Sequence, residues 1–189
     1  MESCSIMLAG VGGQGALLTS RILGSVFMNA GYDVKVSEVH GMSQRGGSVV
    51  TYVKCADKVY SPVITEGEAD YILAFEKLEA ARYLSYLKPK GAMIVNLLEI
   101  APAAVGKGGY PSGIIEKMEQ AGADVSVIDA TALAKEAGNI KSVNVAMLGR
   151  LARLMTFSYD EWVASLREHM RDTYFEVNKK AFDLAYKGE

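Results

Sequence analysis

The first block of apolar residues in the chain predicts a strand that leads through a turn into a helix. The apolar run Ile6–Ala9 is followed by the glycine-rich stretch Gly10–Gly15. A helical pattern opens at about Gln14 and continues to about Ala30, because apolar residues recur there every three or four positions: Leu17, Leu18, Ile22, Leu23, Val26 and Phe27.

The second block predicts two strands joined by a long polar loop. Gly31 is expected to end the first helix as a C-terminal cap, and Tyr32–Val39 alternates as a strand does. The first two strands and their helix should form a right-handed parallel unit. After the loop His40–Ser48 a third strand, Val49–Lys54, follows without an intervening helix. A connection this short cannot make a parallel crossover, so this strand is expected to run antiparallel to a neighbour.

Strands and helices alternate in the rest of the chain. Pro89 and Gly91 are expected to break a helix, and Pro111 to start one at its first turn. Ser158 is a candidate N-terminal cap for a later helix. The predicted strands are 69–75, 92–97 and 124–129, and the predicted helices are 76–87, 111–121, 130–137, a helix from Val143, one from about Tyr159 and one over about 172–186.

The order of these elements predicts an α/β fold. The expected architecture is a Rossmann-like, three-layer, mostly parallel sheet, with one antiparallel strand after the long loop and a helical extension at the C-terminus. Residues 1–189 are expected to form a single domain, with the sheet core in 1–140 and the helical extension in 141–189. The extension should pack on the sheet instead of folding separately.

Composition narrows the classes of partner. The chain has 189 residues, half of them hydrophobic, which is enough for a sizeable core. The formal net charge is −2 and the pI is about 5.8, so the chain lacks the excess of positive charge that is typical of proteins that bind nucleic acid or an anionic membrane. Residues 3–20 are uncharged, but Glu2 and the interrupting glycines argue against a signal or membrane segment. A cytoplasmic location is expected.

The two cysteines, Cys4 and Cys55, form no C-x-x-C pair. A zinc site or an iron–sulfur cluster made by this chain alone is therefore not expected. The sequence also offers no pairing of a nucleophile with a base. His169 stands in a predicted helix beside charged residues, where a solvated helix face is the expected role.

Gly10, Gly12 and Gly15 match G-x-G-x-x-G, the spacing of a phosphate-binding turn. In such a turn the first glycine allows the tight bend, the second lets a ligand approach the backbone, and the third lets helix and strand pack closely. With Gly13 and Gln14 they form a candidate cofactor-binding turn at a helix N-terminus. The same glycines could instead serve only the packing of the strand and helix.

Other candidates lie beyond the second strand. Glu38 could hold a ribose hydroxyl, as an acidic residue does in dinucleotide folds, or be a solvated carboxylate at a strand end. Asn144 is either a helix cap, which is favoured, or a polar group aimed at the cleft. The loop itself offers hydrogen-bond donors suited to a carboxylate or a phosphate, and the alternative is a polar turn before a strand: His40, Ser43, Gln44, Arg45, Gly46 and Gly47.

Two stretches together carry a family resemblance. Gly10–Gly15 and Ser37–Val49 resemble the gamma subunit or domain of 2-oxoacid:ferredoxin oxidoreductases, and the second stretch is most similar to the beta subunit of indolepyruvate:ferredoxin oxidoreductase. Asn144–Gly149 and Asn178–Phe182 also sit where that family has its C-terminal helices. The resemblance covers essentially the whole chain.

The resemblance implies an accessory subunit that is inactive alone. Such complexes decarboxylate a 2-oxoacid oxidatively with coenzyme A, form an acyl-CoA and pass electrons through iron–sulfur clusters to ferredoxin. Thiamine diphosphate, magnesium and the clusters are expected in a larger alpha subunit. The glycine turn and the His40–Gly47 loop would then meet the partner's active site, to hold coenzyme A or substrate or to exclude water. A self-contained dinucleotide-binding module and a purely structural interface subunit remain alternatives.

Overall fold

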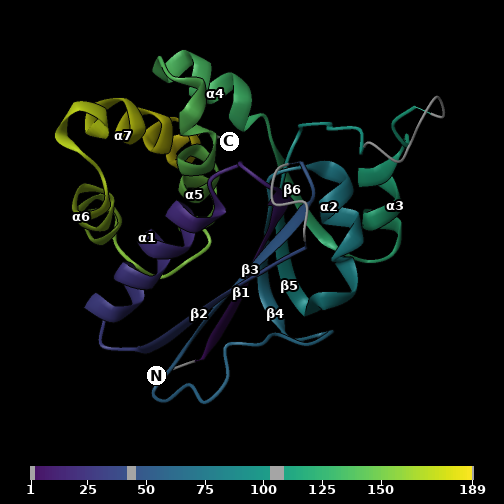
Figure 1. The fold of residues 1–189 in the computed structure, drawn as a ribbon, viewed down its shortest axis with the longest axis horizontal. Coiled ribbons are helices and arrows are strands. Elements are labelled where there is room, and N and C mark those ends of the chain that lie inside the picture. The colour runs from purple at the N-terminus through teal and green to yellow at the C-terminus, as the bar shows by residue number, and fades with distance from the viewer. Residues whose placement is uncertain (1–2, 42–45, 103–108, 189) are drawn as a thin grey trace.

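The computed structural model describes residues 3–41, 46–102 and 109–188, and Figure 1 shows its elements. All the described strands lie in the first two thirds of the chain, and helices alone follow. In chain order they are β1 (Cys4–Val11), α1 (Ala16–Asn29), β2 (Asp33–His40), β3 (Ser48–Ala56), β4 (Ala69–Ala74), α2 (Lys77–Arg82), η1 (Leu84–Tyr86), β5 (Leu87–Asn96), α3 (Ile114–Gln120), β6 (Asp124–Ile128), α4 (Ala130–Ala137), η3 (Ile140–Ser142), α5 (Val143–Ala152), α6 (Tyr159–His169) and α7 (Asp172–Lys187).

The described strands form one sheet in the order β2-β3-β1-β4-β5-β6. β1, β4, β5 and β6 pair in parallel, whereas β3 runs antiparallel to both β1 and β2. The predicted mostly parallel α/β fold and its antiparallel third strand are confirmed. β1 and β2 point the same way, as expected, but β3 lies between them. In the described part of the chain, β2 has β3 as its only neighbour in the sheet.

Both faces of the sheet are covered by helices. Figure 1 shows α1 and α4–α7 on one side and α2 with α3 on the other. Successive residues of β1 point to opposite faces, so Ile6 and Leu8 join the core beneath α1 while Met7 and Ala9 join the core beneath α2. This explains why β1 is a continuous apolar run instead of an alternating one.

The C-terminal helices share a core with the sheet. Trp162 of α6 and Phe182 of α7 are fully buried in the cluster that also contains Leu8. The predicted cap at Ser158 is confirmed: it forms a capping box with Glu161 at the start of α6. α5 and α7 approach closely at Gly149, where a Cβ atom would lie 2.4 Å from the Phe182 carbonyl oxygen.

Three expected boundaries are wrong. Pro89 and Gly91 lie inside β5, at an irregularity in its pairing with β4, and Lys90 between them has φ of +68°. The backbone of β4 comes close there, because a Cβ atom at Gly91 would lie 2.9 Å from the Ala69 carbonyl oxygen. The helix expected to continue to residue 87 ends at Arg82 and is followed by η1.

The third boundary concerns α3. It begins at Ile114, not at Pro111, because Gly113 before it has φ of +67° and this left-handed geometry interrupts the helix. Across the described ranges no helix is both long and apolar enough to cross a membrane.

Alanine substitutions at two helical glycines should have opposite effects. Gly149→Ala should lower the free energy of unfolding by about 1–3 kcal/mol, because its Cβ would collide with α7. Gly24→Ala should raise it by about 0.5–1 kcal/mol, since a Cβ there meets only Val34 at 3.9 Å and alanine favours the helix. Urea unfolding of both variants measures this, and destabilisation of equal size in both would contradict the close α5–α7 contact.

Candidate functional site

A cleft of about 330 Å³ lies at the carboxyl ends of β1 and β2. We call it the glycine-turn cleft. Its walls bring together the glycine turn and two side chains from the end of β2. The lining residues are Gly10, Val11, Gly12, Gly13, Gln14, Gly15, Ala16, Leu17, Glu38, His40, Val49 and Phe75.

Gln14 holds the glycine turn in shape. Its side-chain oxygen Oε1 accepts a hydrogen bond from the Val11 N–H at 2.6 Å, and its Nε2 donates to the Phe75 carbonyl oxygen at 3.2 Å. A Cβ atom at Gly10 would lie 2.6 Å from that Oε1 atom. Glycine at position 10 therefore leaves room for the Gln14 side chain and for the Phe75 ring, whether or not a ligand binds.

A second amide side chain continues this connection across the sheet. Asn96, at the end of β5, donates from Nδ2 to the same Phe75 carbonyl oxygen at 3.2 Å. Its Oδ1 accepts from the N–H of Ala130 at the start of α4, at 3.1 Å. The carboxyl ends of β1, β4 and β5 are thus fixed to one another and to α4.

Asn144 supports the start of α1. Its Nδ2 donates to the Gly15 carbonyl oxygen at 3.3 Å, and its side chain is almost fully buried. A Cβ atom at Gly15, whose φ is +85°, would lie 2.8 Å from that nitrogen. The favoured expectation that Asn144 caps a helix is wrong, because Ser142 occupies the N-cap position of α5.

The two loops of the cleft are hydrogen-bonded to each other. The Gly12 N–H donates to the Gly47 carbonyl oxygen at 2.9 Å, so the close approach to the Gly12 backbone is made by the protein itself. Next to Gly47, the Ser48 hydroxyl donates to the Glu79 carboxylate at 2.5 Å. Glu79 is nearly buried in α2 and also pairs with Arg82 at 3.2 Å.

Among the described residues, Glu38 and His40 are the titratable side chains that line the cleft. The His40 Nε2 atom lies 3.8 Å from the Glu38 Oε1 atom, and both side chains are about one third exposed. Gly46 has φ of +79°. The predicted site residues Ser43, Gln44 and Arg45 lie outside the described residues, so their part in the site stays a prediction.

A buried carboxylate lies behind the cleft. Glu76 follows Phe75 and accepts hydrogen bonds from the Ile100 N–H at 3.0 Å and from the Tyr110 hydroxyl at 2.5 Å. Burial and this hydrogen bond to Glu76 raise the pKa of Tyr110. The phenol therefore stays protonated and remains a donor to Glu76, which gives this pair a structural role.

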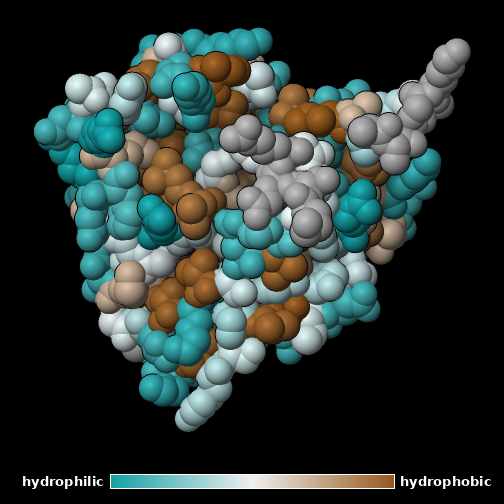
Figure 2. Space-filling model, viewed as in Figure 1, coloured by the Kyte–Doolittle hydropathy of each residue, from teal (hydrophilic) through white to brown (hydrophobic). Residues whose placement is uncertain are grey.

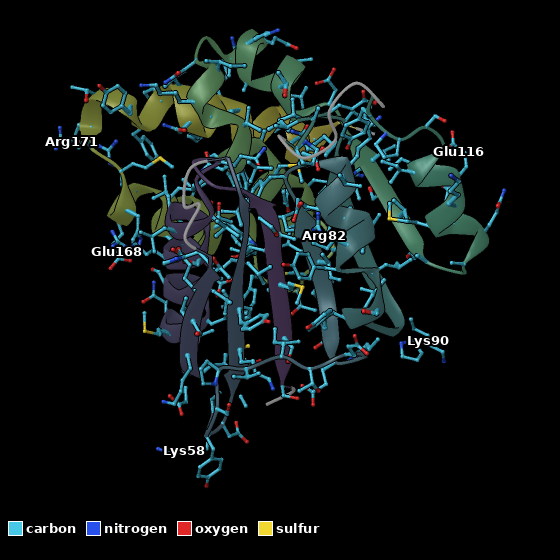
Figure 3. All side chains as sticks on the ribbon, turned by 45° about the vertical axis from the view of Figure 1, so that its right-hand side comes forward. Lys58, Arg82, Lys90, Glu116, Glu168 and Arg171 are labelled. Atoms are coloured by element: carbon cyan, nitrogen blue, oxygen red, sulfur yellow. The ribbon has the colours of Figure 1, made fainter. Side chains whose placement is uncertain are left out.

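The remaining histidine lies elsewhere. His169, at the end of α6, lines a separate cavity of about 510 Å³ with Lys141 and Arg171, and its Nδ1 atom lies 3.0 Å from the Ser165 carbonyl oxygen. Figure 3 shows Arg171 beside the junction of α6 and α7. Within the described ranges, no three side chains of His, Cys, Asp or Glu are grouped so that they could hold a metal ion.

The model for the family described as pyruvate ferredoxin/flavodoxin oxidoreductase matches residues 5–188. The chain belongs to this family. It is 42% identical to the indolepyruvate oxidoreductase subunit IorB of Pyrococcus horikoshii and 40% identical to that of Thermococcus kodakarensis, covering 99% of this chain and 96% of each relative. A pyruvate/ketoisovalerate oxidoreductases common subunit gamma of Thermococcus kodakarensis is 26% identical, covering 96% of this chain and 94% of the relative.

Solved structures share the fold of this family member. Pyruvate oxidoreductase subunit PORC from Thermotoga maritima matches with a TM-score of 0.76 at 20% identity, covering 99% of this chain and 97% of that one. A 2-oxoglutarate:ferredoxin oxidoreductase from Magnetococcus marinus matches with a TM-score of 0.77 at 21% identity, covering this whole chain but 32% of the other. The family resemblance and the fold class inferred from the sequence are confirmed.

Some residues that shape the glycine-turn cleft were not predicted from the sequence. Asn96, Glu79 and the supporting role of Asn144 emerge only from contacts between distant segments. The available signal was a polar residue at an apolar strand end, as at Asn96, or inside an apolar helix, as at Asn144. A buried polar side chain requires a hydrogen-bond partner, and the partner here is the backbone around the cleft.

Replacing Gln14 should destabilise the cleft. Gln14→Ala leaves the Val11 N–H without its acceptor and should lower the free energy of unfolding by about 1–3 kcal/mol. Gln14→Glu keeps that acceptor but sets a carboxylate against the Phe75 carbonyl oxygen, which should raise its pKa above the usual ~4.3. The loss in this variant should therefore shrink as the pH falls from 7 to 5, because the protonated acid can donate.

Urea unfolding at both pH values measures these changes. Gln120→Ala, at the exposed end of α3, is the matched control and should change little. A loss for Gln14→Glu that is the same at pH 7 and pH 5 would contradict the contact with Phe75.

Proposed function

We propose that this chain is the small subunit of an indolepyruvate:ferredoxin oxidoreductase and works only in a complex. The observation that carries this proposal is the 40–42% identity, over nearly the whole length, to subunits named for indolepyruvate oxidoreductase. Identity to a subunit named for pyruvate and ketoisovalerate is lower, at 26%, which favours an arylpyruvate substrate.

The complex would decarboxylate its 2-oxoacid oxidatively with coenzyme A, giving an acyl-CoA and two electrons for ferredoxin. Thiamine diphosphate with magnesium would supply the carbanion chemistry, and iron–sulfur clusters the path for electrons. We assign these groups to a larger partner subunit. The chain has only two cysteines, on β1 and β3, which cannot supply the set of thiolates that a cluster needs.

The glycine-turn cleft would form one wall of the composite active site. Gln14 and Asn144 fix the turn through contacts within the chain, so the turn is a rigid surface before any partner binds. Glu38 and His40 are the side chains placed to contact coenzyme A or substrate from this wall. Closing the wall against the partner would also exclude water from a reactive intermediate.

The surface beside the cleft suits a partner subunit. Leu17 of α1 lines the cleft and is about half exposed, and so is Val39, which lies between Glu38 and His40 on β2. Figure 2 shows apolar patches between polar residues on the face that carries α1. Exposed apolar residues next to a functional cleft are typical of a protein–protein interface, and we assign this surface to the larger subunit.

The proposal predicts activity that depends on both subunits. Co-expression of this chain with the cluster-bearing partner should give reduction of a viologen dye that requires indolepyruvate and coenzyme A. The partner expressed without this chain should lose most of that activity. Equal activity without this chain would overturn the proposal.

The role of the cleft can be tested separately. In the assembled complex, His40→Ala should raise the KM for coenzyme A or for the oxoacid about tenfold, equivalent to ~1.4 kcal/mol of binding. His169→Ala is the matched control, because His169 lines a different cavity, and it should leave both KM values unchanged. If His40→Ala, Gln44→Ala and Arg45→Ala all leave the kinetics unchanged, the loop serves only the interface.

A dinucleotide-binding module is the second candidate, because the cleft joins the glycine turn to Glu38. However, β3 separates β2 from β1, so the two strands lie about 10 Å apart instead of one strand spacing of about 5 Å. The Gly12 N–H is also bound to Gly47. Titration with NAD, NADP and FAD tests this candidate, and lack of binding at millimolar ligand would remove it.

A further inference from the structure

The two cysteines of the chain face each other across a strand pair. Cys4 at the start of β1 and Cys55 at the end of β3 are direct partners in the antiparallel register. Opposed residues in such a pair have Cα atoms about 4.5–5.5 Å apart, within the range of about 4.4–6.8 Å that a disulfide bond spans. Both side chains also contact the core beneath α1, so they point to the same face of the sheet.

The two thiols interact. The contact between the two thiols, together with burial, raises the pKa of Cys4, and the same contact lowers the pKa of Cys55. Both thiols are free in the structure.

A small cavity is lined by both cysteines. It has a volume of about 180 Å³, and we call it the cysteine cavity. Cys4 is partly exposed and Cys55 is buried at its wall. Asp70 also lines it and forms an ion pair with Lys88, which offsets the repulsion between the Asp70 carboxylate and a thiolate. The cavity is large enough for a hydroperoxide.

We propose that Cys4 and Cys55 form a reversible intramolecular disulfide bond when hydrogen peroxide enters the cysteine cavity. This is a modification site in addition to the proposed function, and it does not depend on that function. Two neighbouring thiols of this kind act as a redox-sensing pair in a compartment that otherwise keeps thiols reduced.

The chemistry balances in two steps. The Cys55 thiolate attacks one peroxide oxygen, the O–O bond breaks, and the departing hydroxide takes up a proton to leave as water. Cys55 is then a sulfenic acid. The Cys4 sulfur attacks the Cys55 sulfur, the S–S bond forms, the S–O bond breaks, and the departing hydroxide leaves as water with the Cys4 proton. The two thiols lose two electrons in total, and the peroxide is reduced to two waters.

The disulfide bond would lie away from the glycine-turn cleft. Cys4 is at the amino end of β1, whereas the cleft lies at its carboxyl end. Figure 3 shows Lys58, three residues beyond Cys55, at the end of the sheet far from the loops of the cleft. The bond would close a loop of the chain that contains β1, α1, β2 and β3.

Peptide mapping of the oxidised complex tests the proposal. The complex is treated with hydrogen peroxide, the peroxide is removed with catalase, and free thiols are alkylated with N-ethylmaleimide in denaturant, because Cys55 is buried. Trypsin cuts after Arg21, Lys54 and Lys58, so the bond would join peptides 1–21 and 55–58. We expect this joined species to become the major form and dithiothreitol to restore both free peptides.

Single variants separate the two steps. Cys4→Ser should stop at the sulfenic acid of Cys55, which dimedone traps, and Cys55→Ser should give neither trapped acid nor joined peptides. Three results in the unaltered complex would each overturn the proposal. They are thiols that remain fully open to alkylation, oxidation of Cys55 beyond the sulfenic acid without a bond, and a bond that joins two separate copies of the chain.

Discussion

The carbonyl oxygen of Phe75 is the point on which the candidate site depends. It accepts hydrogen bonds from the side chains of Gln14 and Asn96, which come from the turn after β1 and from the end of β5. A carbonyl oxygen has two lone pairs, and both are used here. Since Asn96 also binds the first N–H of α4, one backbone atom ties together the segments that surround the cleft.

This arrangement changes the meaning of the glycine motif. In a nucleotide-binding turn, the first glycine allows the bend, the second lets a phosphate approach the backbone, and the third lets helix and strand pack closely. Here Gly10 makes room for Gln14, Gly15 makes room for Asn144, and the Gly12 N–H binds the carbonyl oxygen of Gly47. The same glycine spacing therefore allows contacts within the protein itself. A wall with fixed geometry is consistent with the proposed role of this chain in a composite site.

Much of the fold could be predicted from the sequence because the deciding patterns are local. The apolar run of β1, the periodicity of α1 and the bounds of α4 at 130–137 follow from residues close together in the chain. The failures concern distant contacts. Pro89 lies in β5 because of its pairing with β4, and Asn144 binds Gly15 across 129 positions. The candidate cleft could be located from its loops, but not the amides that hold it.

The place of β2 at the edge of the described sheet has a practical consequence. An edge strand offers unpaired backbone groups to any other strand, and the half-exposed Val36 and Val39 add apolar contact. Charged side chains such as Lys35 oppose this only in part. We therefore expect a preparation of the chain alone to associate through β2. Whether the chain is studied as a monomer or as an aggregate then depends on its concentration and on whether it is purified alone or with its partner.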